Sequence, residues 1–298
     1  MMQMAAFTRM ALLPYDFPGP KIPLPQWVNT AQRWSADHLS FLTVPLSDFV
    51  KNQVFAGMNA GLEWIWPPIL MLIVAAFAFF ASGRRWMLPV GSVIGMLLLW
   101  NLGLWSATIQ TFSLVLLATV VAVAIGLPIG IAAALSPTTR RIITPILDFM
   151  QTMPAFVYLL PAIPFFGLGA FSAIIATVVF STPPCVRLIT LGILQVPEDL
   201  IEAADSFGST RRQKLFKVQL PMAMPTIMAG VNQTIMLSLS MVVIAAMISA
   251  PGLGQKVWLA ISMNNTGRGI TSGLAIVILA IILDRMTQRL GRHKGNDK

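Results

Sequence analysis

The chain has 298 residues, of which 56% are hydrophobic and 10% are charged, and its formal net charge is +9. Because a soluble domain carries about 25% charged residues, this composition leaves too little polar surface to face water on all sides and excludes an ordinary soluble domain. The basic residues stand mostly in short segments between apolar runs, where they set the orientation of a membrane protein, so the positive charge does not indicate nucleic acid as a partner.

The N-terminal region, residues 1–63, is expected to lie outside the spanning bundle. Its first twenty residues lack the basic start, apolar run and cleavage site of a signal peptide, and their prolines favour an irregular tail. From residue 21 onwards apolar and polar residues alternate at helical spacing, with Trp27, Ala31 and Trp34 on one face. This segment is too polar to span and predicts an amphipathic helix on the outer surface, either as a scaffold against the bundle or with a direct role in transport.

Apolar stretches predict an all-α bundle of about seven membrane spans within residues 64–290, since a helix needs about 20 apolar residues to cross a bilayer. The stretches cover residues 65–82, 86–105, 108–135, 143–166, 169–192, 223–249 and 269–288. Prolines interrupt the fourth and fifth stretches, where kinks or re-entrant ends are expected. Residues 291–298 form a short basic tail.

Basic residues predict the orientation of these spans. They follow the first, third, fifth and seventh spans, whereas the connections after the second and fourth spans have none and the one after the sixth has only Lys256 and Arg268. The positive-inside rule therefore places the amino terminus outside and the carboxyl terminus inside. The basic residues that follow the four spans are Arg84, Arg85, Arg140, Arg141, Arg211, Arg212, Lys214, Lys217, Arg285, Arg289, Arg292, Lys294 and Lys298.

The longest inside connection, residues 196–221, begins with the pattern of a short helix. Pro197 suits the first helical turn, and Glu198 and Asp199 follow it, where negative charge favours the helix dipole. Four apolar residues at positions i, i+3, i+4 and i+7 predict one apolar stripe on this helix. The stripe consists of Leu200, Ala203, Ala204 and Phe207.

The same connection then carries the signals of a turn and a second helix. Gly208 suits a left-handed helix end, Thr210 and Gln213 have the spacing of a capping box, and Pro221 is expected to end the second helix. An ordinary solvated connector would explain the charges of this loop. It would not explain a capped helix pair whose apolar stripe has no partner within the loop.

These residues also carry a family resemblance. Glu202-Ala203-Ala204, then three residues, Gly208, nine residues and Val218-x-Leu220-Pro221 match the EAA motif, with valine for the usual isoleucine. The chain thus resembles the permeases of ABC importers, and the resemblance implies the type I ABC importer permease fold and a coupling helix that docks on an ATPase subunit. The ATPase-coupling residues implied by the motif are Glu202, Ala203, Ala204, Phe207, Gly208, Leu220 and Pro221.

Three further stretches, residues 147–161, 215–248 and 275–288, are similar to the membrane subunit of glycine betaine/proline importers. Closely related permeases serve choline, carnitine and other small methylated amines, including trimethylamine N-oxide. The resemblance implies a location in the bacterial cytoplasmic (inner) membrane. It also implies an assembly of two permease copies, two ATP-binding subunits on the cytoplasmic face and a substrate-binding protein on the outer face.

No catalytic or cofactor site is expected on this chain. It has no G-x-x-x-x-G-K-[ST] motif, and the nearest sequence, residues 252–256, has the wrong spacing, so ATP and Mg would bind the partner ATPase. Two histidines and one cysteine indicate neither a catalytic cluster nor a metal site. Cys185 is expected to be a small packing residue. We therefore predict a transport subunit that is not an enzyme.

The pathway of a quaternary ammonium solute needs aromatic faces, oxygen atoms or methionine sulfur, because the solute cannot lose its charge. The candidates lie on the fourth and sixth predicted spans, and interhelical packing is the alternative role for each of them. Asp148 is expected to pair with Arg141 or Arg187 in a structural role. The pathway candidates are Gln151, Thr152, Phe156, Tyr158, Asn232, Gln233, Ser238 and Ser240.

An ion-coupled secondary transporter of small amines is the alternative function. Such a transporter would usually show carboxylates for the coupling ion at mid-membrane and internal repeats, and neither is evident in the sequence. A membrane-bound enzyme or a purely structural scaffold would leave the 196–221 loop without a role.

Overall fold

The computed structural model describes residues 22–81 and 86–292, which form helices and their connections without any strand. The chain divides into two compact units, residues 1–40 and 41–298. In the first unit the helix begins at Leu24, and the exposed Trp34 ring stacks on His38 with ring centroids 4.4 Å apart. The predicted tail over residues 1–20 and most of the predicted basic tail lie outside the described residues.

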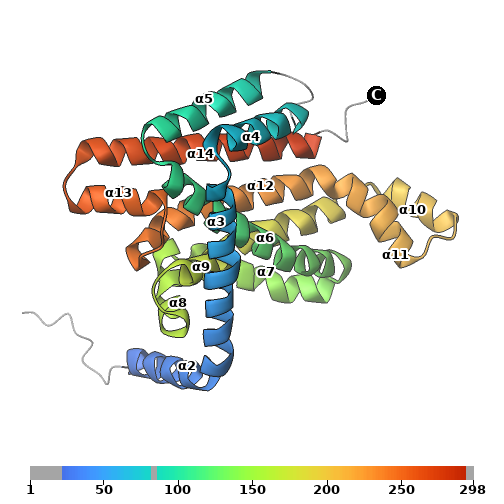
Figure 1. The fold of residues 1–298 in the computed structure, drawn as a ribbon. Coiled ribbons are helices and arrows are strands. Elements are labelled where there is room, and N and C mark those ends of the chain that lie inside the picture. The colour runs from blue at the N-terminus through green and yellow to red at the C-terminus, as the bar shows by residue number, and fades with distance from the viewer. Residues whose placement is uncertain (1–21, 82–85, 293–298) are drawn as a thin grey trace, which may run out of the picture. The chain divides into compact units, whose positions relative to one another are not determined.

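The helices follow one another with short connections along the described chain (Figure 1). In chain order they are α2 (Leu24–Asp48), the π-helix η1 (Phe49–Phe55), α3 (Ala56–Trp64), α4 (Pro67–Ala81), α5 (Met87–Asn101), α6 (Trp105–Leu135), α7 (Pro137–Thr152), η2 (Ala155–Tyr158), α8 (Leu159–Phe166), α9 (Ala170–Leu194), α10 (Glu198–Ser206), α11 (Arg211–Lys214), the π-helix η3 (Leu215–Gln219), α12 (Leu220–Ala245), η4 (Ala246–Ile248), α13 (Leu253–Ser262) and α14 (Thr266–Arg292).

Helix α9 lies between α6 and α12 and is the most buried spanning helix of the second unit. Glycines on α6 permit its close approach to α9, because a Cβ on Gly130 would lie 2.7 Å from Ile189 Cγ2. The Thr190 hydroxyl adds a polar link by donating to the Gly130 carbonyl at 3.0 Å. Small residues at such a crossing allow backbones to pack tightly in a bilayer, where lipid offers no hydrophobic drive for helix association.

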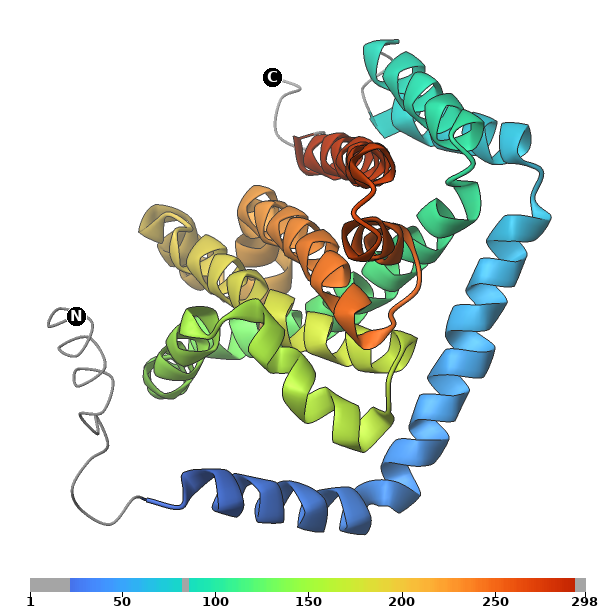
Figure 2. The ribbon, with the colours of Figure 1, turned by 90° about the vertical axis from the view of Figure 1, so that its left-hand side faces the viewer.

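Further helices of the second unit pack on these three helices (Figure 2). Helices α7 and α8 pack on α9, whereas α14 packs on α12 and is itself contacted by α4, α5 and α13. Segments η1 and α3 contact the central helices, and Ser106 at the start of α6 donates to Glu63 at the end of α3. The loop formed by α10 and α11 projects from the end of the bundle at which α9 ends and α12 begins (Figure 1).

The predicted spans correspond to helices or helix pairs, although their boundaries differ by several residues. Among the described residues, four helical stretches are long and apolar enough to cross a membrane, and they match the third, fifth, sixth and seventh predicted spans. The fourth is broken as expected: α7 and η2–α8 meet at a bend of 108°. The first predicted span corresponds to α4, which forms another bent pair with the helical stretch that ends at Trp64. The second predicted span corresponds to the shorter helix α5.

Two features of the fold differ from the sequence-based expectation. The prediction that Pro221 ends the second loop helix is wrong, because one helical stretch runs from Arg211 to Ile248. The π-helix η3 precedes Pro221, and its wider turn leaves room for a ring that would collide with the carbonyl of an ordinary preceding turn. Helix α13 was not predicted, because its ten residues are too short to resemble a span.

The close crossing of α6 and α9 gives a stability prediction. We expect Gly130→Leu to destabilise the purified protein by about 1–3 kcal/mol, because a side chain at this position must displace Ile189. Thermal unfolding followed by size-exclusion chromatography in detergent measures the loss. Gly273→Ala is the matched control on α14, since a Cβ there meets no atom within 4 Å. Equal stability of the two variants would contradict a tight crossing.

Candidate functional site

The loop predicted from the EAA motif begins with α10, a helix of nine residues. Pro197 precedes this helix with extended backbone, and Glu198 and Asp199 occupy its first turn. Negative side chains at this end interact favourably with the helix dipole. Helix α10 therefore begins at Glu198, where the proline and the two acidic residues predict its start.

A Schellman motif ends α10. The Ser209 amide donates to the Ala204 carbonyl at 3.0 Å, and the Gly208 amide donates to the Asp205 carbonyl at 2.9 Å. Gly208 has a φ of 72°, a left-handed conformation that glycine adopts without steric cost. The predicted turn is therefore confirmed, and it reverses the chain within three residues.

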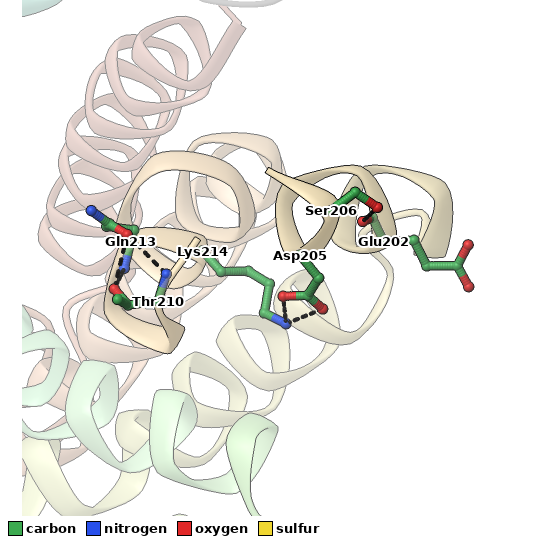
Figure 3. Close-up of polar contacts among 6 residues, drawn as sticks. All are labelled: Glu202, Asp205, Ser206, Thr210, Gln213 and Lys214. Carbon is green, nitrogen blue, oxygen red and sulfur yellow. Dashed lines mark hydrogen bonds and ion pairs between the residues drawn. The ribbon is translucent and has the colours of Figure 1, made fainter. Parts of the chain in front are cut away.

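The second helix starts with the predicted capping box (Figure 3). The Gln213 amide donates to the Thr210 hydroxyl oxygen at 3.3 Å, and the Thr210 amide donates to Gln213 Oε1 at 2.8 Å. Lys214 Nζ lies 2.8 and 2.7 Å from the two carboxylate oxygens of Asp205 and so joins α11 to α10. This ion pair is partly exposed and contributes at most about 1 kcal/mol, so the backbone caps are the firmer constraint.

Part of the apolar stripe on α10 is open in the protomer. Phe207 is 91% exposed and Leu200 is 40% exposed, while the Glu202 side chain points away from the Asp205–Lys214 pair (Figure 3). An exposed phenylalanine beside small residues is typical of a surface that another protein covers. Of the predicted coupling residues, Ala204 and Leu220 are half-buried, and the exposed ones are Glu202, Ala203, Phe207, Gly208 and Pro221.

Helix α7 presents a polar face along its exposed side. Polar residues recur there at helical spacing from the loop end of the bundle to the break after Thr152, while Leu147 is buried against the neighbouring helices. A second exposed face of the same helix is apolar and contains Phe149. The polar face consists of Arg141, Thr144, Asp148, Gln151 and Thr152.

Asp148 pairs with Arg187 of α9, one of the two partners expected for it. The Arg187 and Asp148 side chains are 40% and 57% exposed in the protomer. The Arg187 Nε atom is buried and has no hydrogen-bond partner. The pair is thus open on one side and uses only part of the donor capacity of the guanidinium group.

Helix α12 has an exposed stripe that combines polar and apolar residues. Gln233 and Asn232 line a cavity of about 490 Å³ that Gln288 of α14 also borders. Ser240 is exposed as well, and its hydroxyl donates to the carbonyl of Met236. The stripe consists of Pro225, Ala229, Gln233, Met236 and Ser240.

Hydrogen bonds that were not predicted from the sequence join α14 to α12. Asn232 Nδ2 donates to Asp284 Oδ1 at 2.8 Å, and the Thr287 hydroxyl donates to Asn232 Oδ1 at 2.6 Å. Gln288 Nε2 also donates to Asp284 at 2.7 Å. Asn232 therefore has interhelical partners, although it also borders the cavity. Asp284 and Asn232 are 52 residues apart, so only the helix packing identifies them as partners.

The eight predicted pathway residues do not form one cluster within the protomer. Gln151, Thr152 and Phe156 are exposed near the break after α7, whereas Tyr158 is buried there and donates to the Met150 carbonyl. Ser238 is fully buried and accepts from Thr119 at 3.4 Å. Asn232, Gln233 and Ser240 lie on α12, as described above. Their assignment to the pathway stays a prediction.

Comparison with known proteins places this geometry in a family. Residues 126–295 match the model of the binding-protein-dependent transport system inner membrane component. The glycine betaine/carnitine transport permease protein GbuB of Listeria monocytogenes is 48% identical over 92% of this chain and 97% of its own length. The glycine betaine/proline betaine transport system permease protein ProW of Escherichia coli is 47% identical over 91% of this chain and 76% of its own length.

A structural comparison agrees on the fold. The MetNI methionine ABC transporter, solved in inward-facing conformations, matches with a TM-score of 0.61 at 23% identity, over 64% of this chain and 95% of that chain. The helical bundle with its projecting loop thus has the type I ABC importer permease fold. The family match adds that the chain is a multi-pass transport subunit of the inner membrane. The chain belongs to the family of binding-protein-dependent transport system inner membrane components, whose members work with an ATPase and a substrate-binding protein.

The capping box gives a prediction about loop order. Thr210→Ala removes the acceptor of the Gln213 amide and should cost about 1 kcal/mol at this helix start. We expect amide hydrogen exchange at Gln213 to become about fivefold faster, because about 1.4 kcal/mol corresponds to tenfold. Thr210→Ser keeps the hydroxyl and should exchange at nearly the wild-type rate. Identical exchange in both variants would show that the cap does not hold the loop.

Proposed function

We propose that this chain forms the translocation pathway of an importer for glycine betaine, proline betaine or a related small methylated amine. The observation that carries the proposal is the exposed apolar stripe of a capped helix pair at one end of a spanning bundle. Relatives at 47–48% identity over more than nine tenths of the chain are named for glycine betaine transport and support the cargo class. Choline, carnitine and trimethylamine N-oxide are the other candidate cargoes.

The proposed assembly contains two copies of this chain around one pathway. Two-fold pairing of identical chains is the commonest closed arrangement of an oligomer, and the exposed stripe of α12 offers a surface with polar residues for a shared path. Two ATPase subunits would bind the α10–α11 loops, and a substrate-binding protein would dock at the opposite end. ATP and Mg would bind the ATPase subunits alone, so this subunit would not be an enzyme.

The proposed orientation follows the distribution of basic residues. The α10–α11 loop carries Arg211, Arg212 and Lys214 and would face the cytoplasm. The amino terminus would then lie outside and the carboxyl terminus inside, and the amphipathic helix within residues 1–63 would lie on the outer face. The spanning domain would cover residues 64–290.

Transport would use the loop to couple ATP binding to alternating access. Glu202, Phe207 and Gly208 would contact a cleft on the ATPase, and the closing of the ATPase dimer would move the spans as rigid bodies. The exposed candidates Gln151, Thr152, Phe156, Gln233 and Ser240 would line the pathway. The buried candidates, Tyr158 and Ser238, would shape it from behind through packing.

Reconstitution tests the cargo directly. Proteoliposomes that contain this chain with its ATPase and binding protein should take up radiolabelled glycine betaine or a related methylated amine when ATP is enclosed with the ATPase. Parallel measurements with choline, carnitine and trimethylamine N-oxide rank the cargoes. Uptake of none of these solutes would contradict the proposed cargo class, and ATP-independent uptake driven by an ion gradient would favour the secondary transporter.

The coupling role gives a second prediction. We expect Gly208→Val and Glu202→Arg each to lower uptake at least tenfold without loss of membrane insertion. Valine strains the left-handed turn, and arginine reverses a charge at the proposed contact. Binding-protein-stimulated ATP hydrolysis and uptake in proteoliposomes measure both effects.

Gly208→Asn is the matched control, because asparagine enters the left-handed region more readily than other side chains. It should retain more uptake than Gly208→Val. Full stimulated hydrolysis and full transport in both Gly208→Val and Glu202→Arg would contradict the coupling role of the loop.

A further inference from the structure

The Asp148–Arg187 pair lies well inside the spanning bundle. Arg187 stands seven residues before the end of α9 at Leu194, which places it about 10 Å from the loop end at 1.5 Å per residue. Asp148 stands on α7, which starts at the same end of the bundle and runs antiparallel to α9. Of the two ion pairs between side chains of the described residues, this one belongs to the membrane-spanning segments and the other, Asp205–Lys214, belongs to the loop.

The exposure of this pair would be unfavourable against lipid. With 57% of the Asp148 side chain and 40% of the Arg187 side chain open, hydrocarbon contact would leave both charges largely unsolvated, which is strongly unfavourable. The polar face of α7 continues from Asp148 to Gln151 and Thr152, both exposed. This face of α7 is therefore suited to an aqueous path, whereas the apolar face with Phe149 is suited to lipid.

The pair is also incompletely bonded, which makes it exchangeable. The guanidinium group of Arg187 donates to one Asp148 oxygen through a single terminal nitrogen, and 40% of the side chain stays exposed. Arginine can bind a carboxylate with two parallel hydrogen bonds, so a second carboxylate could use donors that Asp148 leaves free. Once displaced, Asp148 offers its negative charge to a cation in the same space.

Aromatic groups lie at the helix break that follows α7. Phe156 is 57% exposed there, and Tyr158 packs edge-to-face on Phe180 of α9 with ring centroids 5.8 Å apart. The exposed face of an aromatic ring attracts a quaternary ammonium group. An exposed aromatic ring on η2, a carboxylate on α7 and a guanidinium group on α9 are thus carried by neighbouring elements.

We propose that the Asp148–Arg187 pair and the polar face of α7 form a water-filled transit subsite for a zwitterionic solute, whose carboxylate binds Arg187 and whose ammonium group binds Asp148. The subsite rests on the proposed transport of betaines, which carry these two charges on one small molecule. In the empty state the two side chains neutralise each other. A passing zwitterion separates them and replaces each partner with a group of the same charge.

Thiol labelling tests whether the polar face of α7 is open to water, whatever the cargo is. The chain's single cysteine, Cys185, is fully buried, so an introduced cysteine can be labelled selectively. In the assembled transporter, Gln151→Cys should react at least tenfold faster than Phe149→Cys with a trimethylammonium methanethiosulfonate, a charged reagent that does not enter hydrocarbon. Equal rates for the two variants would overturn the proposal.

Transport by a neutral pair tests the role of the charges. We expect Asp148→Asn/Arg187→Gln to lower glycine betaine uptake at least tenfold, while ATP hydrolysis stimulated by the loaded binding protein stays within twofold of wild type. The ATP consumed per solute then rises, a readout that a purely structural pair would not change. Unchanged uptake overturns the proposal, and so does a parallel fall of uptake and hydrolysis.

Arg187→Lys is the conservative control, because it keeps the positive charge and should retain more uptake than Arg187→Gln. Failure of the wild-type complex to transport any methylated amine contradicts the proposed function instead. The labelling ratio at Gln151 and Phe149 then decides by itself whether this face of α7 lines an aqueous path.

Discussion

The packing of α9 between α6 and α12 is the constraint on which the other parts of the bundle depend. In a bilayer, helices associate through close contact and hydrogen bonds between helices and not by escape from water, so the glycines at these crossings are essential. Gly126 and Gly130 admit Cys185 and Ile189 from α9. On the other side, Gly192 of α9 admits Thr226, and Gly230 of α12 admits Leu188. One helix is thus held on two faces with little space for adjustment.

This rigid centre positions both functional surfaces. The α10–α11 loop connects the end of α9 to the start of α12, so these two packed helices hold the exposed stripe of α10 in position. The same α9 carries Arg187, which meets Asp148 on α7, a helix that packs less extensively. The partner-binding loop and the polar face of α7 are therefore attached to one central helix. A displacement of α9 would move both of them.

Local signals in the sequence predicted the loop in detail. The positive φ of Gly208 and the reciprocal bonds of Thr210 and Gln213 depend on residues within a few positions of one another, and such short-range rules transfer well. The effect of Pro221 was mispredicted because it depends on the π-turn before it. The hydrogen bond from Asn232 to Asp284 was not predicted, because it joins segments that are distant in the sequence. The exposure of the Asp148 pair likewise follows only from the packing of α7 on α9.

One continuous helical stretch from Arg211 to Ile248 joins the second helix of the loop to the spanning helix α12. Its 38 residues span about 57 Å at 1.5 Å per residue, so a tilt of about 10° around one end shifts the other by about 10 Å. No flexible linker between α11 and α12 absorbs such a tilt, and the π-turn at Leu215–Gln219 is the one irregularity at their junction. A movement of the loop is thereby transmitted along the whole length of the span.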